Sequence, residues 1–518
     1  MVIIGAGPAG LTAAYELSKQ GVRSTILEAD AVVGGLSRTA EYKNYCFDIG
    51  GHRFFTKVSV VEKMWKEVLG EDLITRLRLS RIFYRGKFFK YPIEPMNALF
   101  GLGVWESAHC AMSYLLARLL PEKPENDFEA WVSNRFGRRL FQIFFKSYTE
   151  KVWGIPCREI GADWAAQRIR GLSFRSLVWN ALRSRKSRDK RTVIKTLIDE
   201  FLYPRKGPGM MWQRTREIVE SRGSELVLGA KVDRIRWEPG RVLSVRAGGT
   251  EYCADHFVST MPIRDLMNAL DPAPPDWVLE AGRGLKYRDF LTTCLICRGT
   301  NLFPDNWVYI HDPSVRVGRI QNYGNWSQDM VPDPGMSCLG MEYFCFEGDD
   351  LWSADDTDII ERSRQEVEKL GLARSSDVVD ATVLRMPKAY PVYDATYQRS
   401  LAAVREFITS LPNLQLVGRN GMHRYNNQDH SMLTAILASR NILGAKYDLW
   451  QVNADSDYAE EGAEIREAEL RAMERSQPLV PQRLADQLGS LAQQLSVGSG
   501  PTPSAYDETV TSSHSPRV

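Results

Sequence analysis

The chain has 518 residues, of which 44% are hydrophobic and 10% aromatic, and this predicts a globular protein with at least two intertwined domains. The 66 Lys and Arg residues nearly balance the 64 Asp and Glu residues, so the net charge of +2 gives no reason to expect nucleic acid or a strongly anionic membrane as a partner. The eight cysteines are scattered, which predicts a reduced, cytoplasmic protein. No signal peptide opens the chain, and its first expected strand, residues 1–4, is so short that we expect native residues to precede it.

The first thirty residues alternate strand, turn, helix and strand, as VII, GAGPAG, LTAAYELSKQG and STILEAD. The turn is a G-x-G-x-x-G motif, in which Gly5 permits a tight turn, Gly7 lets the backbone approach a pyrophosphate, and Gly10 lets helix and strand pack closely. The helix that begins at Pro8 and Ala9 turns its N-terminal N–H groups toward the phosphates. Glu28, at the end of the second strand, can accept hydrogen bonds from ribose hydroxyls. Together they predict a Rossmann-type dinucleotide site.

A second glycine pair identifies the dinucleotide as FAD. The run Gly34-Gly35-Leu36-Ser37-Arg38 follows Glu28 at the spacing seen in large FAD-binding families, where these residues brace the pyrophosphate. Val232 stands where such families place a backbone contact to adenine. No second Rossmann motif supports a separate NAD(P) domain.

The remaining patterns predict an α/β fold in which a discontinuous Rossmann-type FAD-binding domain carries inserted helical and mixed-sheet substrate domains. Helical periodicity dominates from Val58 to Arg170, broken by the strands RIFYRG and KFFKYP, and β-rich runs follow from Glu225 and from Leu285. The expected parts are an FAD domain (residues 1–75, 205–265 and 410–450), a mainly helical insertion (76–204), a mixed-sheet substrate domain (266–409), a helical extension (451–475) and a disordered tail (476–518).

Three segments have alternative interpretations. The apolar stretch from Met96 to Leu120 carries charges, so we expect a buried or surface-lying helix rather than a membrane span. Cys294 and Cys297 form the only C-x-x-C motif but lie in the apolar run FLTTCLIC, which favours a buried strand over a metal or redox site, and we expect no metal. The basic run at residues 183–191 favours a solvated loop over an anion-binding role.

Four further motifs point to a site around the flavin. They are DIGGH at residues 48–52, YPRKGPG at 203–209, FFKSYTEKVW at 144–153, and GRNGMHRYNNQDHS at 418–431, where Gly418, Arg419 and the helix start at Asn427, Gln428, Asp429 and Ser431 are expected to contact the cofactor.

These motifs resemble the UDP-galactopyranose mutase family, most closely its eukaryotic branch. The matching elements, in the family's order, are Gly50-Gly51-His52, Lys151-Val152-Trp153-Gly154, Arg319 to Ser327, Ala389 to Val392, Gly418 to Gly421 and Asn427 to Ser431. The resemblance implies a nucleotide-sugar mutase that exchanges pyranose and furanose rings without net redox change, through covalent catalysis by N5 of reduced flavin. It also implies an external reductant such as NAD(P)H.

The resemblance also implies a role for each matching side chain. Arg168 and Arg319 would hold the diphosphate, Tyr390 and Tyr425 would donate hydrogen bonds to it, Arg419 would face the flavin, and His52 would lie near N5. Tyr91, Phe144, Thr149 and Trp153 would line the substrate site. Trp326 is also expected in the catalytic site, where the eukaryotic members have tyrosine. Thr149 and Glu94 depart from the family as well, and these departures leave the sugar and the base open.

Two other function classes remain. Flavin amine oxidases, protoporphyrinogen oxidase and phytoene desaturases share the FAD architecture but transfer hydride to N5. Arg168, Arg170 and Arg319 favour the mutase, because an apolar substrate needs few cations. A flavoprotein redox sensor has little support beside so many polar groups. The sequence does not define the oligomeric state.

Overall fold

A computed structural model describes residues 1–91, 93, 95–162, 200–300 and 302–453 of the chain. The expected basic run at 183–191, most of the helical extension, the tail, and Glu94, Arg168 and Arg170 lie outside the described residues. In the described part, no helix has the length and apolar character needed to cross a membrane.

A five-stranded parallel sheet forms the dinucleotide-binding part. Its order is β20 (Leu414–Leu416), β13 (Phe257–Ser259), β1 (Val2–Ile4), β2 (Thr25–Leu27) and β9 (Glu225–Val227). Five strands from widely separated segments therefore share one sheet, which confirms the expected discontinuous Rossmann-type fold.

Alternation along these short strands gives the sheet two apolar faces. Ile3, Ile26 and Val258 pack into a core under α1 (Pro8–Lys19), α2 (Ser59–Leu69), α10 (Gly209–Ser221) and α17 (Gln428–Ile442). Val2, Ile4 and Phe257 pack into a second core. That core is covered by α11 (Ile263–Ala269), α12 (Asp276–Gly284), α16 (Tyr397–Thr409) and a small sheet of β12 (Thr250–Cys253), β11 (Arg241–Ala247), β10 (Val232–Glu238) and β14 (Leu270–Asp271).

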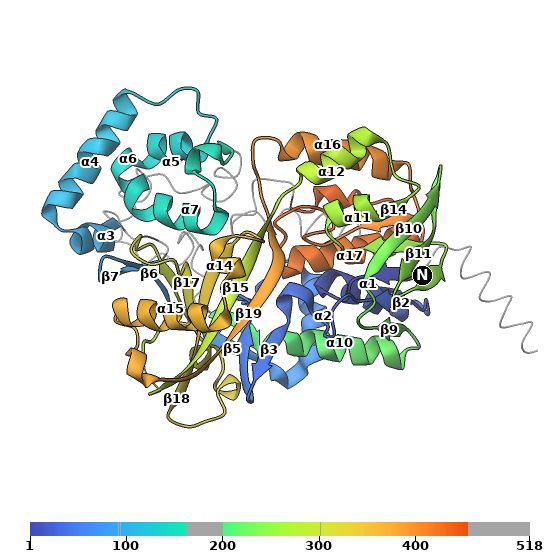
Figure 1. Cartoon of the computed structure of the whole chain (residues 1–518), viewed down its shortest axis with the longest axis horizontal. Helices are drawn as coiled ribbons and strands as arrows, with labels where there is room; N and C mark the ends of the chain where they lie inside the picture. Colours follow the sequence, from blue (N-terminus) through green and yellow to red (C-terminus); the bar gives the residue numbers. More distant parts are fainter. Residues whose placement is uncertain (92, 94, 163–199, 301, 454–518) are drawn as a thin grey trace, which may run out of the picture. The chain divides into compact units, whose positions relative to one another are not determined.

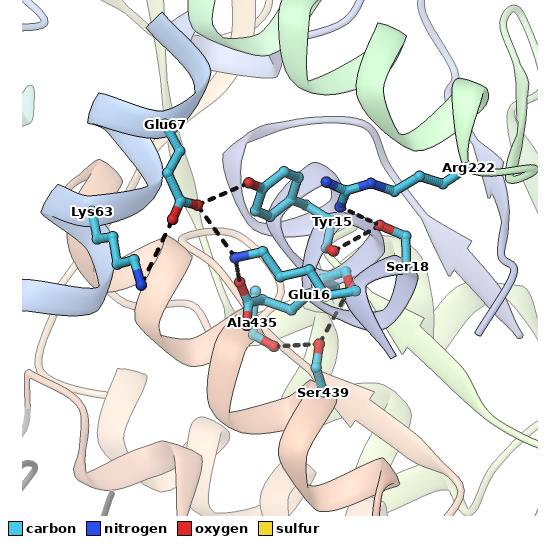
Figure 2. Close-up of polar contacts among 10 residues, drawn as sticks. Tyr15, Glu16, Ser18, Lys63, Glu67, Arg222, Ala435 and Ser439 are labelled. Atoms are coloured by element: carbon cyan, nitrogen blue, oxygen red, sulfur yellow. Dashed lines mark hydrogen bonds and ion pairs between the residues drawn. The ribbon is translucent and has the colours of Figure 1, made fainter. Parts of the chain in front are cut away.

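Polar contacts tie the helices of the first face together, as Figure 2 shows. The Tyr15 hydroxyl of α1 donates to Glu67 of α2 at 3.1 Å, and Arg222, just after α10, donates to Ser18 of α1 at 3.1 Å. Ser439 of α17 donates to the Ala13 carbonyl of α1 at 3.4 Å. These contacts hold the helix that starts at the glycine-rich turn.

A seven-stranded mixed sheet forms the second part. Its order is β19 (Val378–Pro391), β15 (Tyr287–Arg298), β18 (Met336–Cys345), β17 (Arg319–Asn322), β16 (Trp307–Ile310), β6 (Ser80–Tyr84) and β7 (Lys87–Lys90). Strand β15 is buried over almost its whole length, as expected for FLTTCLIC. One face is covered by α14 (Asp350–Ser353) and α15 (Asp356–Lys369).

Two domain limits differ from the expected ones. The hairpin β6–β7 belongs to the mixed sheet although it lies inside the expected helical insertion, and β5 (Leu73–Leu77) pairs with β8 (Glu200–Pro204) across the expected limit at residue 76. Helices α12 and α16 lie in the range expected for the substrate domain but pack into the second core of the parallel sheet. Hydrophobic periodicity reports local structure, and long-range pairing decides these limits.

The helical lobe comprises α3 (Pro95–Leu102), α4 (Val104–Leu119), α5 (Phe128–Phe136), α6 (Arg138–Phe141) and α7 (Ser147–Trp153). Figure 1 shows α4 on the outer side of α5 and α6, and α7 on the side of the mixed sheet. The expected helix in the stretch Met96 to Leu120 is thus a pair of helices at the surface.

Candidate functional site

The β1–α1 turn has the shape of a pyrophosphate cradle. A Cβ added to Gly7 would meet only the Cα of Gly35, at 3.8 Å, so the first and second glycine turns face each other with no side chain between them. A Cβ on Gly10 would lie 1.9 Å from the Gly5 carbonyl oxygen, so Gly10 serves close packing of the chain itself. Gly5, with φ of +97°, and Gly10 therefore shape the turn, and Gly7 opens it to a ligand.

The acidic end of β2 is fixed to this turn. Glu28 accepts from the Ala6 N–H at 2.6 Å and from the Asp30 N–H at 2.9 Å. Burial raises the pKa of the Glu28 carboxyl, and these two hydrogen bonds oppose that rise. The Glu28 carbonyl accepts from the Ala230 N–H at 2.7 Å, which brings the start of β10 at Val232 toward the same edge. Glu28 and Val232, for which ribose and adenine contacts are predicted, thus lie near the same edge of the sheet.

The second glycine turn is anchored to the first. Gly34 donates its N–H to the Ala6 carbonyl at 2.9 Å, and Arg38 forms an ion pair with Asp30. Ser37 is buried, and Leu36 packs against the apolar cluster around Ile49 and Phe290.

The C-terminal motif completes the cradle. A Cβ on Gly418 would lie 3.1 Å from the Cβ of Ala9 in the first turn of α1, and the Gly418 N–H donates to Thr434 of α17 at 3.0 Å. Asn427 caps α17, so the expected cofactor-contacting residues lie in the cap and first turn of that helix: Asn427, Gln428, Asp429 and Ser431. Gly418 therefore links α1 and α17, whose N-termini are both predicted to face the cofactor.

The Gly50-Gly51-His52 turn lies against the mixed sheet. A Cβ on Gly51 would lie 3.0 Å from Gln321 Nε2, and a Cβ on Gly50 would lie 3.6 Å from Arg319 Nη2. His52 is partly buried, and its Nδ1 is shielded from solvent. Burial, helped by the positive charges of Arg419 and Arg319, lowers the pKa of its imidazole to about 3, so the ring is neutral at physiological pH.

A buried ion pair orients Arg319. Its Nε donates to Glu342 on the neighbouring strand β18, and Gln321 donates to the other Glu342 oxygen at 2.7 Å. Burial raises the pKa of Glu342, and Arg319 opposes that rise. Because Nε is engaged, the far end of the guanidinium is left to face the Gly50 turn.

Two phenols stack beside a second guanidinium. The rings of Tyr390 and Tyr425 lie 5.6 Å apart at 16°. The guanidinium of Arg419 lies 5.4 Å from the Tyr390 ring and 5.0 Å from the Tyr425 ring, and it donates to the carbonyls of Asn426 and Ala389. Burial raises the pKa of Tyr390 to about 12, so its hydroxyl stays protonated and able to donate.

Helix α7 is held against the mixed sheet by two buried cations. Lys151 Nζ donates to the carbonyls of Ile310, Asp312 and Val317, and burial lowers the pKa of this ammonium to about 8. Arg288 of β15 donates to the carbonyls of Val152 and Lys151 at the helix C-terminus. The two cations fix Thr149 and Trp153, and the Trp153 ring lies 6.3 Å from Tyr425.

Two predicted site residues, Trp326 and Phe144, have side chains that are buried in aromatic cores. Trp326 is enclosed in an aromatic core, where its Nε1–H donates to the Asn306 carbonyl, so it supports the Gly51 turn from behind rather than presenting a donor to a ligand. Phe144 is buried 5.1 Å from Phe89. Tyr91 is 41% exposed and lies 4.7 Å from Tyr309.

Sequence reasoning missed four side chains of this site, namely Glu342, Gln321, Tyr148 and Tyr309. Tyr148 of α7 is partly buried, and burial raises its pKa well above the usual range while nearby Arg319 opposes the rise. Tyr309 of β16 lies 5.5 Å from Tyr148. The cross-strand pairing of Arg319 with Glu342 carries no local sequence signal.

The described residues fit a bound dinucleotide with a polar ring system. The cradle between Gly7 and Gly35 would be filled by a side chain on Gly7. Four buried polar atoms around the turns lack a hydrogen bond within the described residues: His52 Nδ1, Gln321 Oε1, Asn420 Oδ1 and Gln428 Oε1. Buried polar atoms are normally satisfied, so these suit the edges of a polar ligand.

Comparison with known proteins supports the fold and the cofactor. A model of the flavin containing amine oxidoreductase family matches residues 8–443. The crystal structure of reduced UDP-galactopyranose mutase superposes with a TM-score of 0.76 at 22% identity over 88% of this chain and 98% of that one. A putrescine oxidase with bound putrescine superposes with a TM-score of 0.58 at 16% identity over 86% and 98%. These results confirm the mutase-like fold and the FAD cofactor expected from the sequence.

The curated relatives match over shorter segments. An L-amino-acid oxidase of Crotalus adamanteus is 43% identical over 67 residues, which is 13% of this chain and 13% of that protein. The chain therefore spans about an eighth of the length of this relative.

Proposed function

The chain belongs to the flavin containing amine oxidoreductase family, and from the groups around its flavin turn we propose that it is a nucleotide-sugar mutase. In this proposal the enzyme interconverts pyranose and furanose rings of a sugar joined to a nucleoside diphosphate. Its FAD works in the reduced state and is kept reduced by an external donor such as NAD(P)H.

One observation carries the proposal. Two guanidinium groups, of Arg319 and Arg419, and two stacked phenols, of Tyr390 and Tyr425, converge beside the Gly50 turn. A leaving diphosphate develops negative charge, which fixed cations and phenol donors stabilise in a site shielded from water. An ammonium substrate would meet a net positive charge there, because Glu342 balances only one of the two guanidinium groups.

The side chains around the Gly50 turn have separate roles in the proposed reaction. Reduced FAD supplies an electron-rich nitrogen nucleophile when bound. Arg319, oriented by Glu342, holds the diphosphate, and the hydroxyls of Tyr390 and Tyr425 donate to its oxygens. His52 stays neutral beside the flavin, so it adds no positive charge that would oppose the attack on the sugar.

The departures at Trp326, Thr149 and Glu94 limit the proposal to the class of nucleotide sugar. Trp326 presents no donor to the site, and Thr149 is a buried residue of α7. The site therefore supports a diphosphate anchor more specifically than it supports one sugar.

A flavin oxidoreductase is the second candidate. It is supported by the family as a whole and by the resemblance to an L-amino-acid oxidase. The stacked Tyr390 and Tyr425 rings would suit an apolar or aromatic substrate as well as a sugar.

Ligand binding by the reduced holoenzyme tests the proposal. Thermal shift is measured with UDP, other nucleoside diphosphates, nucleotide sugars, L-amino acids and putrescine. The proposal expects stabilisation by at least one nucleoside diphosphate and by its sugar conjugate. Stabilisation by an amino acid or amine alone would favour the oxidoreductase.

A further inference from the structure

Helix α4 is amphipathic, but its apolar side faces solvent and its polar side faces the protein. Its exposed residues include a continuous set of large apolar side chains, which extends from the end of α3 past the end of α4: Phe100, Val104, Trp105, Met112, Leu115, Leu116, Leu119 and Leu120. Trp105 and Phe100 are 84% and 79% exposed. We call these eight residues the α3–α4 face. Exposed contiguous apolar patches of this kind mark interaction sites.

The side of α4 that faces the protein is polar or small. Glu106 forms an ion pair with Arg139, and the Arg139 N–H donates to Ser113 at 3.0 Å. Cys110 is the only residue of α4 that is buried. A Cβ on Gly137 would lie 2.7 Å from the Tyr114 nitrogen, so the backbones approach closely there. The helix is therefore anchored by polar contacts and turns its apolar side outward.

The charges around the face are mainly positive. Glu106, Glu122 and Glu125 are each paired with an arginine. Lys87, Arg118 and Lys123 have no ion-pair partner in the part of the chain that the structure describes. Lys87 donates to the carbonyl of Gly101, beside Phe100, and Arg118 and Lys123 lie toward the other end of α4.

The size of the face argues against a second protein. Helix α4 is 16 residues long, about 24 Å. A stable interface normally uses roughly 20–30 residues of all kinds on each side, which is more than the exposed residues that α3 and α4 present together. An interfacial helix on a membrane needs only one apolar side with aromatic residues and flanking cations.

We propose that the α3–α4 face docks on the surface of a bilayer that contains anionic phospholipids, with Trp105 and Phe100 inserted at the headgroup level. The helix lies in the plane of the interface, and Lys87, Arg118 and Lys123 contact lipid phosphates. The FAD cradle, the mixed sheet and the proposed mutase site do not depend on this docking.

Vesicle co-sedimentation of the full-length FAD-loaded chain tests the proposal. The probes are extruded vesicles of phosphatidylcholine alone and of phosphatidylcholine with phosphatidylglycerol at about 7:3. Trp105→Glu/Leu116→Glu should reduce partitioning to the anionic vesicles about tenfold or more, because each buried apolar side chain contributes appreciably. Arg118→Gln/Lys123→Gln should reduce it about fivefold per cation.

A matched control is Trp277→Glu, because Trp277 is also the second residue of a helix and is 46% exposed. It should bind as the unaltered chain does, and retained FAD shows that each variant is folded. The proposal is overturned if the unaltered chain stays in solution with both vesicles, or if Trp277→Glu loses as much binding as Trp105→Glu/Leu116→Glu. It is also overturned if light scattering gives a dimer that Trp105→Glu/Leu116→Glu converts to a monomer without vesicle binding, since the face would then join two copies of the chain.

Discussion

Arg319 and Glu342 stand directly opposite each other on the antiparallel strands β17 and β18, and the carboxylate accepts from the arginine Nε. This pair decides which way the guanidinium points, and it places the proposed diphosphate anchor beside the Gly50 turn. A buried carboxylate that loses its partner is costly, so binding and stability must be separated in any test of Arg319.

Arg319→Ala should weaken nucleoside diphosphate binding about tenfold or more, because a charge-assisted hydrogen bond contributes roughly 1.5–3 kcal/mol. It should also lower the melting temperature, since Glu342 is left unpaired. Arg319→Ala/Glu342→Gln should recover stability but not binding, measured by calorimetry and thermal melting. Arg316→Ala, which removes an exposed ion pair with Asp350, is the control. Unchanged affinity in Arg319→Ala would make Arg319 purely structural.

Gly7 and Gly10 give opposite predictions from one motif. In Gly7→Val the new side chain enters the cradle, where the added Cβ meets only Gly35, so the chain should fold but lose FAD. In Gly10→Val the Cβ would strike the Gly5 carbonyl, so both fold and FAD should be lost. Circular dichroism and flavin absorbance after purification distinguish the two. A yellow Gly7→Val protein with full FAD occupancy would contradict the assignment of the β1–α1 turn as the pyrophosphate site.

The residues of the candidate site differ in how well they can be predicted from the sequence. The turn Gly5 to Gly10 and the acid at Glu28 follow from motifs whose spacing is local. The roles of His52, Arg319, Arg419, Tyr390 and Tyr425 come only from the resemblance of their motifs to the mutase family. Glu342 could not be predicted, because strand register brings it to Arg319 from a distant segment. Tyr148 lies in the motif at residues 144–153, but only the docking of α7 brings it near Arg319. The buried position of Trp326 could not be predicted either, because only the tertiary structure places its indole in the core.

Gly154→Ala should loosen helix α7. Gly154 has φ of +67°, and a Cβ there would lie 2.5 Å from the Arg288 Cζ, so Arg288 would be displaced from the helix C-terminus. Gly229→Ala is the matched control, with φ of +68° and no atom within 4 Å. Both carry left-handed strain of roughly 1–2 kcal/mol, and only Gly154→Ala should lose further stability and raise KM. Equal melting temperatures of the two variants would contradict a stabilising role of Arg288 at the C-terminus of α7.

His52 should make stability sensitive to acid. Its pKa is about 3 in the folded chain and near the ordinary value of 6.5 when unfolded, so the unfolded state binds more protons between these values. The contribution of His52 to the free energy of unfolding should therefore fall as pH drops from about 6.5 toward 3, by at most roughly 1.4 kcal/mol per pH unit, in addition to the contributions of His311 and His423, whose pKa values burial also lowers. His52→Gln should flatten this slope in urea titrations, whereas His109→Gln on the exposed side of α4 should not. A slope that is unchanged in His52→Gln would contradict a neutral His52 imidazole in the folded chain.

The redox requirement of turnover tests the proposed function most directly. Enzyme reduced with dithionite is incubated anaerobically with a panel of nucleotide sugars, and the products are analysed for ring isomers while flavin absorbance is recorded. A mutase should form pyranose and furanose isomers with the flavin remaining reduced and no reductant consumed. Bleaching of oxidised flavin by an amine or other reduced substrate, with no isomer formed under reducing conditions, would contradict the mutase and establish an oxidoreductase.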